Sequence, residues 1–180
     1  MSEIRQLALP GVVEIVPKRF EDDRGFFSET YSERDLPNVR FVQDNHSRST
    51  LPGTVRGLHY QIGAMAQDKL VRVVRGAIFD VAVDIRRSSP TAGQWVGLTV
   101  SAKKWNQIFV PKGFAHGFMT LEPDTEVIYK VSASYAPEAE RSIRFDDPGI
   151  AIDWPEPAGE IILSDKDARA ASFQAAEMFE

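Results

Sequence analysis

Apolar and polar residues alternate with a period of two along much of this chain. In residues 77–85 the side chains of Val81 and Val83 fall on one face, and those of Asp80 and Asp84 fall on the other. A two-residue period is typical of a strand with one buried face. The same reasoning predicts strands at residues 70–74, 94–100, 107–110, 118–121 and 126–133.

Turn-forming residues separate these runs. Arg75-Gly76 predicts a hairpin-like break between residues 70–74 and 77–85, and prolines mark several later turns. Short strands with turns at this spacing predict an all-β sandwich or barrel. The chain has 180 residues and no repeat or linker, so we expect a single domain over residues 1–180.

The C-terminal end has a different pattern. Ser164 can cap a helix, and Asp167 follows it three residues later. A short C-terminal helical segment is therefore predicted. Its apolar side would be formed by Ala168, Ala171, Ala175 and Met178.

Composition narrows the class of protein. A hydrophobic content of 43% and a charged content of 26% are ordinary for a soluble globular protein. No apolar run approaches the roughly 18 residues of a membrane span, and the first residues do not resemble a signal peptide. The net charge of −5 argues against nucleic acid or an anionic membrane as the partner. The absence of cysteine excludes disulfides and thiolate catalysis, and it fits a cytoplasmic location.

Three residues offer the chemistry of proton transfer next to a ketone. His59 lies in a conspicuous Arg-Gly-Leu-His-Tyr-Gln stretch, Lys69 follows ten residues later, and Tyr129 lies far along the chain. A histidine with its ordinary pKa of about 6.5 can remove a proton near neutral pH. A lysine ammonium can stabilise the resulting enolate oxygen, and a phenol can return the proton from the opposite face.

A further motif narrows the fold. Pro111-x-Gly113-x-x-His116 resembles the second motif of the cupin superfamily, whose members are double-sheet jelly rolls with a deep central pocket. Metal-binding cupins have His-x-His in their first motif, but Tyr60-Gln61 follows His59 here. A metal site needs about three protein ligands, and the three histidines of this chain lie in separate segments. We therefore expect no metal.

Ordered blocks of sequence give a more specific resemblance. They run from about residue 10 to about residue 168, nearly the whole chain. Together they resemble the dTDP-4-dehydrorhamnose 3,5-epimerase family, although no single block would be specific. The blocks are Asp23-Arg24-Gly25-Phe26-Phe27, Phe41-Val42-Gln43-Asp44-Asn45-His46-Ser47, Arg56-Gly57-Leu58-His59-Tyr60-Gln61, Gln67-Asp68-Lys69-Leu70-Val71, Phe79-Asp80-Val81-Ala82-Val83-Asp84, Pro111-x-Gly113-Phe114-Ala115-His116-Gly117-Phe118, Tyr129-Lys130 and Leu163-Ser164-x-Lys166-Asp167.

The resemblance implies a role for each matching position. His59 would be the proton acceptor and Tyr129 the proton donor. Lys69 would stabilise the enolate oxygen, and Asp167 would partner the histidine. Eight further positions would hold the nucleotide and the sugar: Arg24, Glu29, Gln43, Asn45, Arg56, His116, Glu140 and Lys166.

The resemblance also implies a reaction and an assembly. The expected enzyme inverts C3 and C5 of dTDP-4-dehydro-6-deoxy-D-glucose to give dTDP-4-dehydro-L-rhamnose, in dTDP-L-rhamnose biosynthesis. It would work as a homodimer and use no metal or redox cofactor. An N-terminal arm of about residues 1–30 would complete the site of the neighbouring subunit, with Arg24 or Glu29 as the borrowed residue.

Each candidate also has an ordinary structural explanation. Lys69 precedes an apolar strand and is explained as a solvated edge charge. Tyr129 shares a face with apolar neighbours and is explained as a core residue with a satisfied hydroxyl. Asp167 is explained by helix capping alone. Tyr135 has the parity of Tyr129 and is a second candidate for the proton donor.

Arg56 conflicts with simple alternation, which directs its side chain away from His59. A β-bulge at Gly57 would redirect it; otherwise its binding role rests on the resemblance. Rival functions also stay open. One is an epimerase acting at C3 or C5 alone, or a keto-isomerase on the same scaffold. Another is a non-catalytic sugar-binding cupin or a metal-dependent cupin oxygenase.

Overall fold

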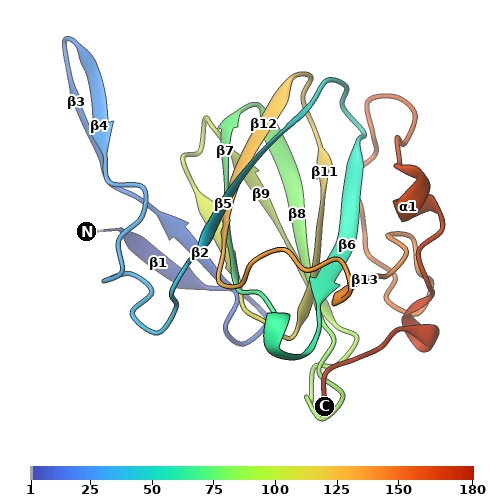
Figure 1. The fold of residues 1–180 in the computed structure, drawn as a ribbon. Coiled ribbons are helices and arrows are strands. Elements are labelled where there is room, and N and C mark those ends of the chain that lie inside the picture. The colour runs from blue at the N-terminus through green and yellow to red at the C-terminus, as the bar shows by residue number, and fades with distance from the viewer. Residues whose placement is uncertain (1) are drawn as a thin grey trace.

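Two antiparallel sheets build most of the molecule in the computed structural model, which describes residues 2–180 (Figure 1). The six-stranded sheet has the order β1-β2-β10-β7-β12-β5, and the five-stranded sheet has the order β13-β6-β11-β8-β9. A separate hairpin pairs β3 with β4. The strands are β1 (Glu3–Gln6), β2 (Val13–Val16), β3 (Arg19–Asp22), β4 (Gly25–Ser28), β5 (Gln43–Ser49), β6 (Val55–Gln61), β7 (Lys69–Arg75), β8 (Ala77–Asp84), β9 (Trp95–Ser101), β10 (Gln107–Val110), β11 (Phe114–Thr120), β12 (Thr125–Val131) and β13 (Glu140–Ser142).

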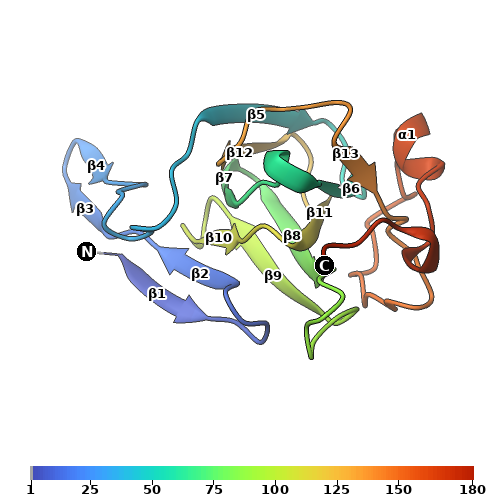
Figure 2. The same ribbon diagram turned by 60° about the horizontal axis from the view of Figure 1, so that its bottom comes forward.

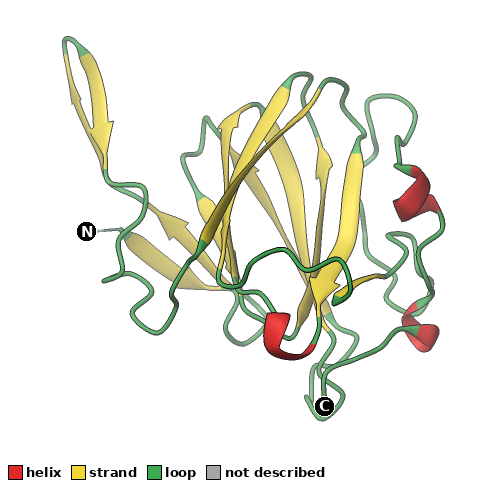
Figure 3. Cartoon of the chain, in the orientation of Figure 1, coloured by secondary structure: helices red, strands yellow, loops and turns green. Residues whose placement is uncertain are grey.

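The two large sheets face each other across an apolar core. Val71 and Val127 of the six-stranded sheet pack in one cluster with Ile78 and Phe118 of the five-stranded sheet. Each such side chain contributes roughly 1.5–3 kcal/mol when it is fully buried. The predicted all-β, cupin-like double-sheet jelly roll is confirmed, and strands dominate the view in Figure 3.

The C-terminal segment covers the outer face of the five-stranded sheet (Figure 1). Ile150, Trp154 and Phe173 belong to the cluster that packs on the outward side chains of this sheet. The hydroxyl of Tyr60 donates to the backbone carbonyl of Glu177 over 2.7 Å. Both faces of the five-stranded sheet are therefore buried along much of its length, one against the other sheet and one against this segment.

The hairpin predicted around Arg75-Gly76 is wrong. β7 pairs with β10 and β12 in one sheet, whereas β8 pairs with β9 and β11 in the other. Gly76 has a φ of 78° and takes the chain across from one sheet to the other. A tight turn in the sequence thus marks a change of sheet, which local turn chemistry alone does not distinguish from a hairpin.

The C-terminal helix is shorter than its apolar spacing predicts. Ser164 does cap α1 (Asp165–Ala168), but the helix ends after one turn. Ala171 then forms a parallel bridge with Ile143, and the backbone N–H of Phe173 donates to the carboxylate of Asp147. These tertiary hydrogen bonds replace the helical ones. The apolar residues of the segment therefore pack against the five-stranded sheet from an irregular backbone and not from a helix. Two 3-10 turns, η1 (Gly63–Met65) and η2 (Phe173–Ala175), complete the short helices.

The β3–β4 hairpin projects from the rest of the chain (Figures 1 and 2). Phe20, Phe26 and Phe27 lie on it with 53%, 52% and 71% of their surface exposed. Such a cluster is unusual on a protein surface, where large apolar side chains are mostly scattered singly.

Candidate active site

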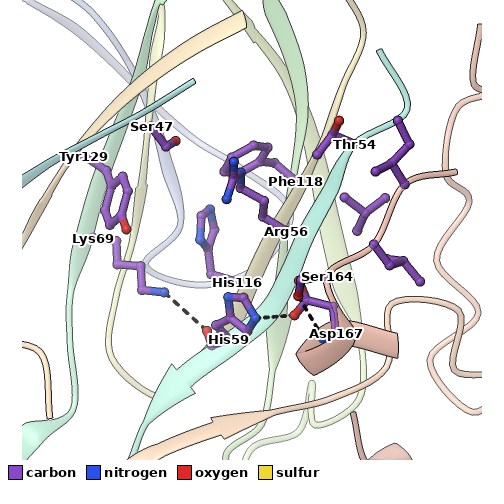
Figure 4. A pocket seen from close by; sticks show the side chains of 13 residues that line it. Ser47, Thr54, Arg56, His59, Lys69, His116, Phe118, Tyr129, Ser164 and Asp167 are labelled. Atoms are coloured by element: carbon purple, nitrogen blue, oxygen red, sulfur yellow. Dashed lines mark hydrogen bonds and ion pairs between the residues drawn. The ribbon is translucent and has the colours of Figure 1, made fainter. Parts of the chain in front are cut away.

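A cavity of about 370 Å³ opens between the two sheets (Figure 4). Its walls come from both sheets and from the C-terminal segment. A second cavity of about 240 Å³ shares His59, Lys69 and Tyr129 with the first. The first is lined by Ser47, Thr54, Val55, Arg56, His59, Lys69, His116, Phe118, Tyr129, Ile162, Leu163, Ser164 and Asp167.

His59 and Asp167 form a hydrogen-bonded pair at one wall. The distance from His59 Nε2 to Asp167 Oδ1 is 2.5 Å, and the aspartate side chain is 4% exposed. Burial alone would raise the pKa of Asp167, but the hydrogen bonds from His59 and Ser164 outweigh it and lower that pKa. The carboxylate therefore stays charged, and it occupies one ring nitrogen of His59. Nδ1 is the nitrogen that remains for a ligand.

A β-bulge brings Arg56 into the same cavity. The register between β6 and β11 pairs His59 with His116 and Arg56 with Phe118, so two residues of β6 lie opposite one of β11. The extra residue reverses the alternation, and Arg56 and His59 both line the cavity. Gly57 has a φ of 132°, and a Cβ there would lie 2.9 Å from the carbonyl oxygen of His116. The bulge is where the sequence predicts it.

Lys69 is buried at the start of β7, which differs from the solvated edge charge considered above. Its Nζ donates to the backbone carbonyl of His59 over 3.3 Å. Burial lowers its pKa to about 8, although the charges of Asp80 and Glu140 act in the opposite direction. The ammonium therefore points into the cavity within reach of His59 and loses its proton more easily than an ordinary lysine.

Tyr129 lies on the opposite sheet from His59. It pairs with Asn45 and Val71 on the neighbouring strands, and its side chain points into the space between the sheets. Burial raises the pKa of its phenol, while the charge of Arg56 lowers it. A protonated phenol therefore faces the cavity at neutral pH.

Sequence reasoning missed a second histidine–aspartate pair. His116 Nε2 lies 2.9 Å from both carboxylate oxygens of Asp80, and both side chains are buried. His116 was predicted to hold ligand, and Asp80 was given no role. The available signal was Asp80 itself, a carboxylate inside an apolar strand of the core, where a charge needs a partner.

The second cavity gathers three of the remaining predicted ligand-binding residues. Gln43, Asn45 and Glu140 line it together with Tyr135. The hydroxyl of Tyr135 donates to Glu140 Oε2 over 2.9 Å, and Lys166 Nζ lies 2.5 Å from Glu140 Oε1. Hydrogen bonding with Lys166 helps to lower the pKa of Glu140 against the effect of burial.

Arg24 and Glu29 are not brought to the cavity within one chain. Arg24 pairs with Asp22 on the projecting hairpin, and Glu29 pairs with Arg34. All four side chains are largely exposed. Both predicted ligand residues therefore lie on or next to the β3–β4 hairpin and line neither the first nor the second cavity of their own chain.

Neither a metal cluster nor a membrane helix is found in residues 2–180. No three histidine or acidic side chains there are grouped as metal ligands would be. No described helix is long and apolar enough to cross a membrane.

Known proteins with similar sequences and structures were compared with this chain. The family model of dTDP-4-dehydrorhamnose 3,5-epimerase matches residues 6–175. The enzyme of that name from Pseudomonas aeruginosa is 50% identical over 179 residues, 97% of each chain. A crystal structure of dTDP-6-deoxy-D-glucose-3,5-epimerase from Legionella pneumophila, in complex with dTDP-4-keto-L-rhamnose, superposes with a TM-score of 0.93. It is 44% identical and covers 98% of this chain and 95% of its own.

A relative with a different specificity also has this fold. ChmJ, a 3'-monoepimerase from Streptomyces bikiniensis in complex with dTDP-quinovose, is 31% identical with a TM-score of 0.87. The match covers 93% of this chain and 86% of that one. The fold and the cavity thus define the class of the protein, a jelly-roll isomerase. They do not determine which carbons of the sugar are inverted, because enzymes named for different carbons share this fold. Within that class, this chain belongs to the dTDP-4-dehydrorhamnose 3,5-epimerase family.

Proposed function

We propose that the cavity inverts C3 and C5 of dTDP-4-dehydro-6-deoxy-D-glucose and so forms dTDP-4-dehydro-L-rhamnose. One observation carries the proposal: His59 and Tyr129 face a single cavity from opposite sheets, with the buried ammonium of Lys69 beside them. Both carbons flank the C4 ketone of this substrate, so the protons on both are acidified. One base serves both centres if the sugar rotates or changes pucker between the two steps.

His59 is the base in this proposal. Its Nδ1 takes the proton from the carbon next to the ketone, and the electron pair of the C–H bond moves into the enolate. Asp167 holds Nε2 at 2.5 Å, fixes the tautomer and stabilises the imidazolium that forms.

Tyr129 is the acid on the opposite face. Inversion requires that the new proton arrive from the side opposite the abstraction, so the acid and the base must bracket the ring. The phenol of Tyr129 then gives its proton to the enolate carbon. Its raised pKa keeps that proton available near neutral pH.

Lys69 stabilises the enolate. Its ammonium is placed to donate to the C4 oxygen as negative charge develops there. One such preorganised donor typically accounts for about 10²–10³ in kcat, because the buried site strengthens the interaction.

The remaining residues hold the nucleotide. Arginine forks suit a diphosphate because they donate two parallel hydrogen bonds, and Arg56 lines the cavity for that purpose. The amides of Gln43 and Asn45 and the Glu140–Lys166 pair lie at the other end of the binding space. The ligand therefore extends from Arg56 in the first cavity, past the proton-transfer residues that both cavities share, toward Tyr135 in the second.

The working enzyme is a homodimer in this proposal. The β3–β4 hairpin supplies Arg24 or Glu29 to the neighbour, which accounts for its exposed phenylalanines and its distance from its own cavity. Two inactive variants test this directly. If the arm acts in trans, co-expressed His59→Asn and Arg24→Ala chains form mixed dimers with one intact site, and activity returns. No recovery in purified mixed dimers would overturn the exchanged arm.

Solvent exchange tests the reaction itself. The substrate is incubated with enzyme in D₂O, and NMR follows deuterium at C3 and C5. Label at both carbons with inversion is the expected result. Label at one carbon favours the monoepimerase, the activity that ChmJ carries by name. Label at neither carbon would end the epimerase proposal.

A further inference from the structure

We propose that Ser164 is a positioning residue that holds Asp167 in the orientation His59 requires. The inference rests on the proposed role of His59 as the base. Ser164 lines the cavity wall beside both residues (Figure 4).

The Ser164 hydroxyl accepts one hydrogen bond and donates another, and both involve Asp167. Its Oγ accepts from the backbone N–H of Asp167 over 3.1 Å, so its own proton is free to be donated. That proton goes to Asp167 Oδ2, 2.9 Å away. The two carboxylate oxygens are thereby held separately, Oδ2 by Ser164 and Oδ1 by His59.

The contact between Ser164 and Asp167 matters because the backbone around Asp167 is not part of a sheet. Asp167 lies on a single helical turn, α1, rather than on either sheet. Backbone hydrogen bonds fix the segment on one side at Ile162, which pairs with Gly53 and Val55, and on the other side at Ala171, which accepts from Arg144. Ser164 lies between these anchors and ties the carboxylate to the start of the turn.

The contact affects the base in two ways. A carboxylate held at both oxygens keeps the orientation that binds Nε2 of His59, whereas one held at a single oxygen can rotate about its side-chain bonds. A hydroxyl donor also favours the charged form of Asp167. The carboxylate then stays ionised while the imidazolium forms.

Helix capping is the competing explanation, and the choice of variant separates the two. Ser164→Ala and Ser164→Gly both remove the hydroxyl, but glycine is a far better cap than alanine. Ser164→Thr keeps the hydroxyl. Ser172→Ala is a matched control, because Ser172 caps η2 in the same segment without touching Asp167.

We expect kcat to fall roughly 10–100-fold in both Ser164→Ala and Ser164→Gly, the usual range for one hydrogen bond to a charged group. KM stays unchanged, and Ser164→Thr recovers most of the loss. Deuterium exchange at C3 and C5 falls in proportion to inversion, because the base is affected. In ¹⁵N-labelled protein the His59 Nε2–H resonance broadens in both hydroxyl-free variants and is unchanged in Ser172→Ala.

Three outcomes would overturn the inference. Full activity in Ser164→Gly with a loss in Ser164→Ala would leave only the cap. A raised KM with normal kcat would make Ser164 a substrate contact. An equal loss in Ser172→Ala would indicate general destabilisation of the segment. Failure of the proposed function is distinguishable from these, since wild-type protein itself would then show no exchange.

Discussion

Two histidine–aspartate pairs lie at one cavity, and they differ in how their carboxylates are held. Asp80 lies on β8, the strand next to the β11 strand that carries His116, so the sheet itself sets their distance. Asp167 comes from a one-turn helix 108 residues along the chain from His59. The first geometry is fixed by the backbone ladder, whereas the second depends on side-chain contacts.

Exposure separates the pairs further. The side chains of His116 and Asp80 are 8% and 0% exposed, and that of His59 is 27% exposed. A base that removes protons from a bound sugar must reach it and must be free to change charge. The same two residue types thus give one pair suited to proton transfer and one suited to stabilising the cavity wall and its charges.

Removing each histidine in turn gives the largest expected difference. His59→Asn should lose turnover by roughly 10²–10⁴-fold or more, and exchange at C3 and C5 should disappear with it. His116→Asn should retain measurable exchange. It should also lose about 1–3 kcal/mol in free energy of unfolding, because buried Asp80 loses its partner. NMR in D₂O and urea unfolding measure both effects. Equal loss of exchange in two well-folded variants would remove the distinction between the pairs.

Removing the acid while keeping the base sharpens the same comparison. In Tyr129→Phe, turnover should fall by about 10²–10⁴-fold, but His59 can still remove a proton and return it on its own face. Exchange with retention should therefore survive at a carbon whose proton His59 takes. Tyr135→Phe is the control, because its hydroxyl is bonded to Glu140 in the second cavity. An unchanged ratio of exchange to inversion in folded Tyr129→Phe would transfer the donor role to Tyr135.

The fold could be predicted from the sequence best where apolar and polar residue types alternate. β8 lies close to its predicted bounds because valine and aspartate alternate along it, although its aspartates are buried as well. β10 also matches its predicted bounds. β5 was missed because its inward side chains, such as Asn45 and Ser47, line the cavity and are polar. β11 begins four residues earlier than predicted, because it is buried throughout and has no alternation. Polar cavity-lining residues in β5 and burial of both faces in β11 thus remove the alternation that would reveal these strands.

The site was predicted by resemblance and only partly by physical pattern. The bulge at Gly57 was foreseeable because glycine often marks such irregularities, and it resolves the conflict over Arg56. The contact between Asp167 and His59 was not foreseeable from periodicity, since it joins a strand to a distant turn. A buried carboxylate such as Asp80 signals locally that it needs a partner, but the sequence does not say that the partner is His116. The contact of Ser164 with the Asp167 carboxylate likewise comes from the structure.

The smallest expected effect is a shift in the pH dependence of catalysis. It would link the buried His116–Asp80 pair to the reaction, because the charge of Asp80 acts on Lys69. Because burial lowers the pKa of Lys69 to about 8, kcat/KM should decline as pH rises through that value and the ammonium is lost. Lys69→Met should be slower and should lack this decline. The charge of Asp80 raises the pKa of Lys69, so Asp80→Asn should move the decline to lower pH.

Asp167→Asn is the matched control for that shift, because it removes a carboxylate from the other pair. It should reduce kcat by disturbing His59 while leaving the pH of the decline unchanged, since Asp167 does not contribute to the pKa of Lys69. Folded Asp80→Asn protein and Asp167→Asn protein are compared by kcat/KM from neutral to alkaline pH. A decline that stays in place in Asp80→Asn, or moves equally in both variants, would show that the buried pair does not tune Lys69. In that case its contribution would be confined to packing and to the stability measured for His116→Asn.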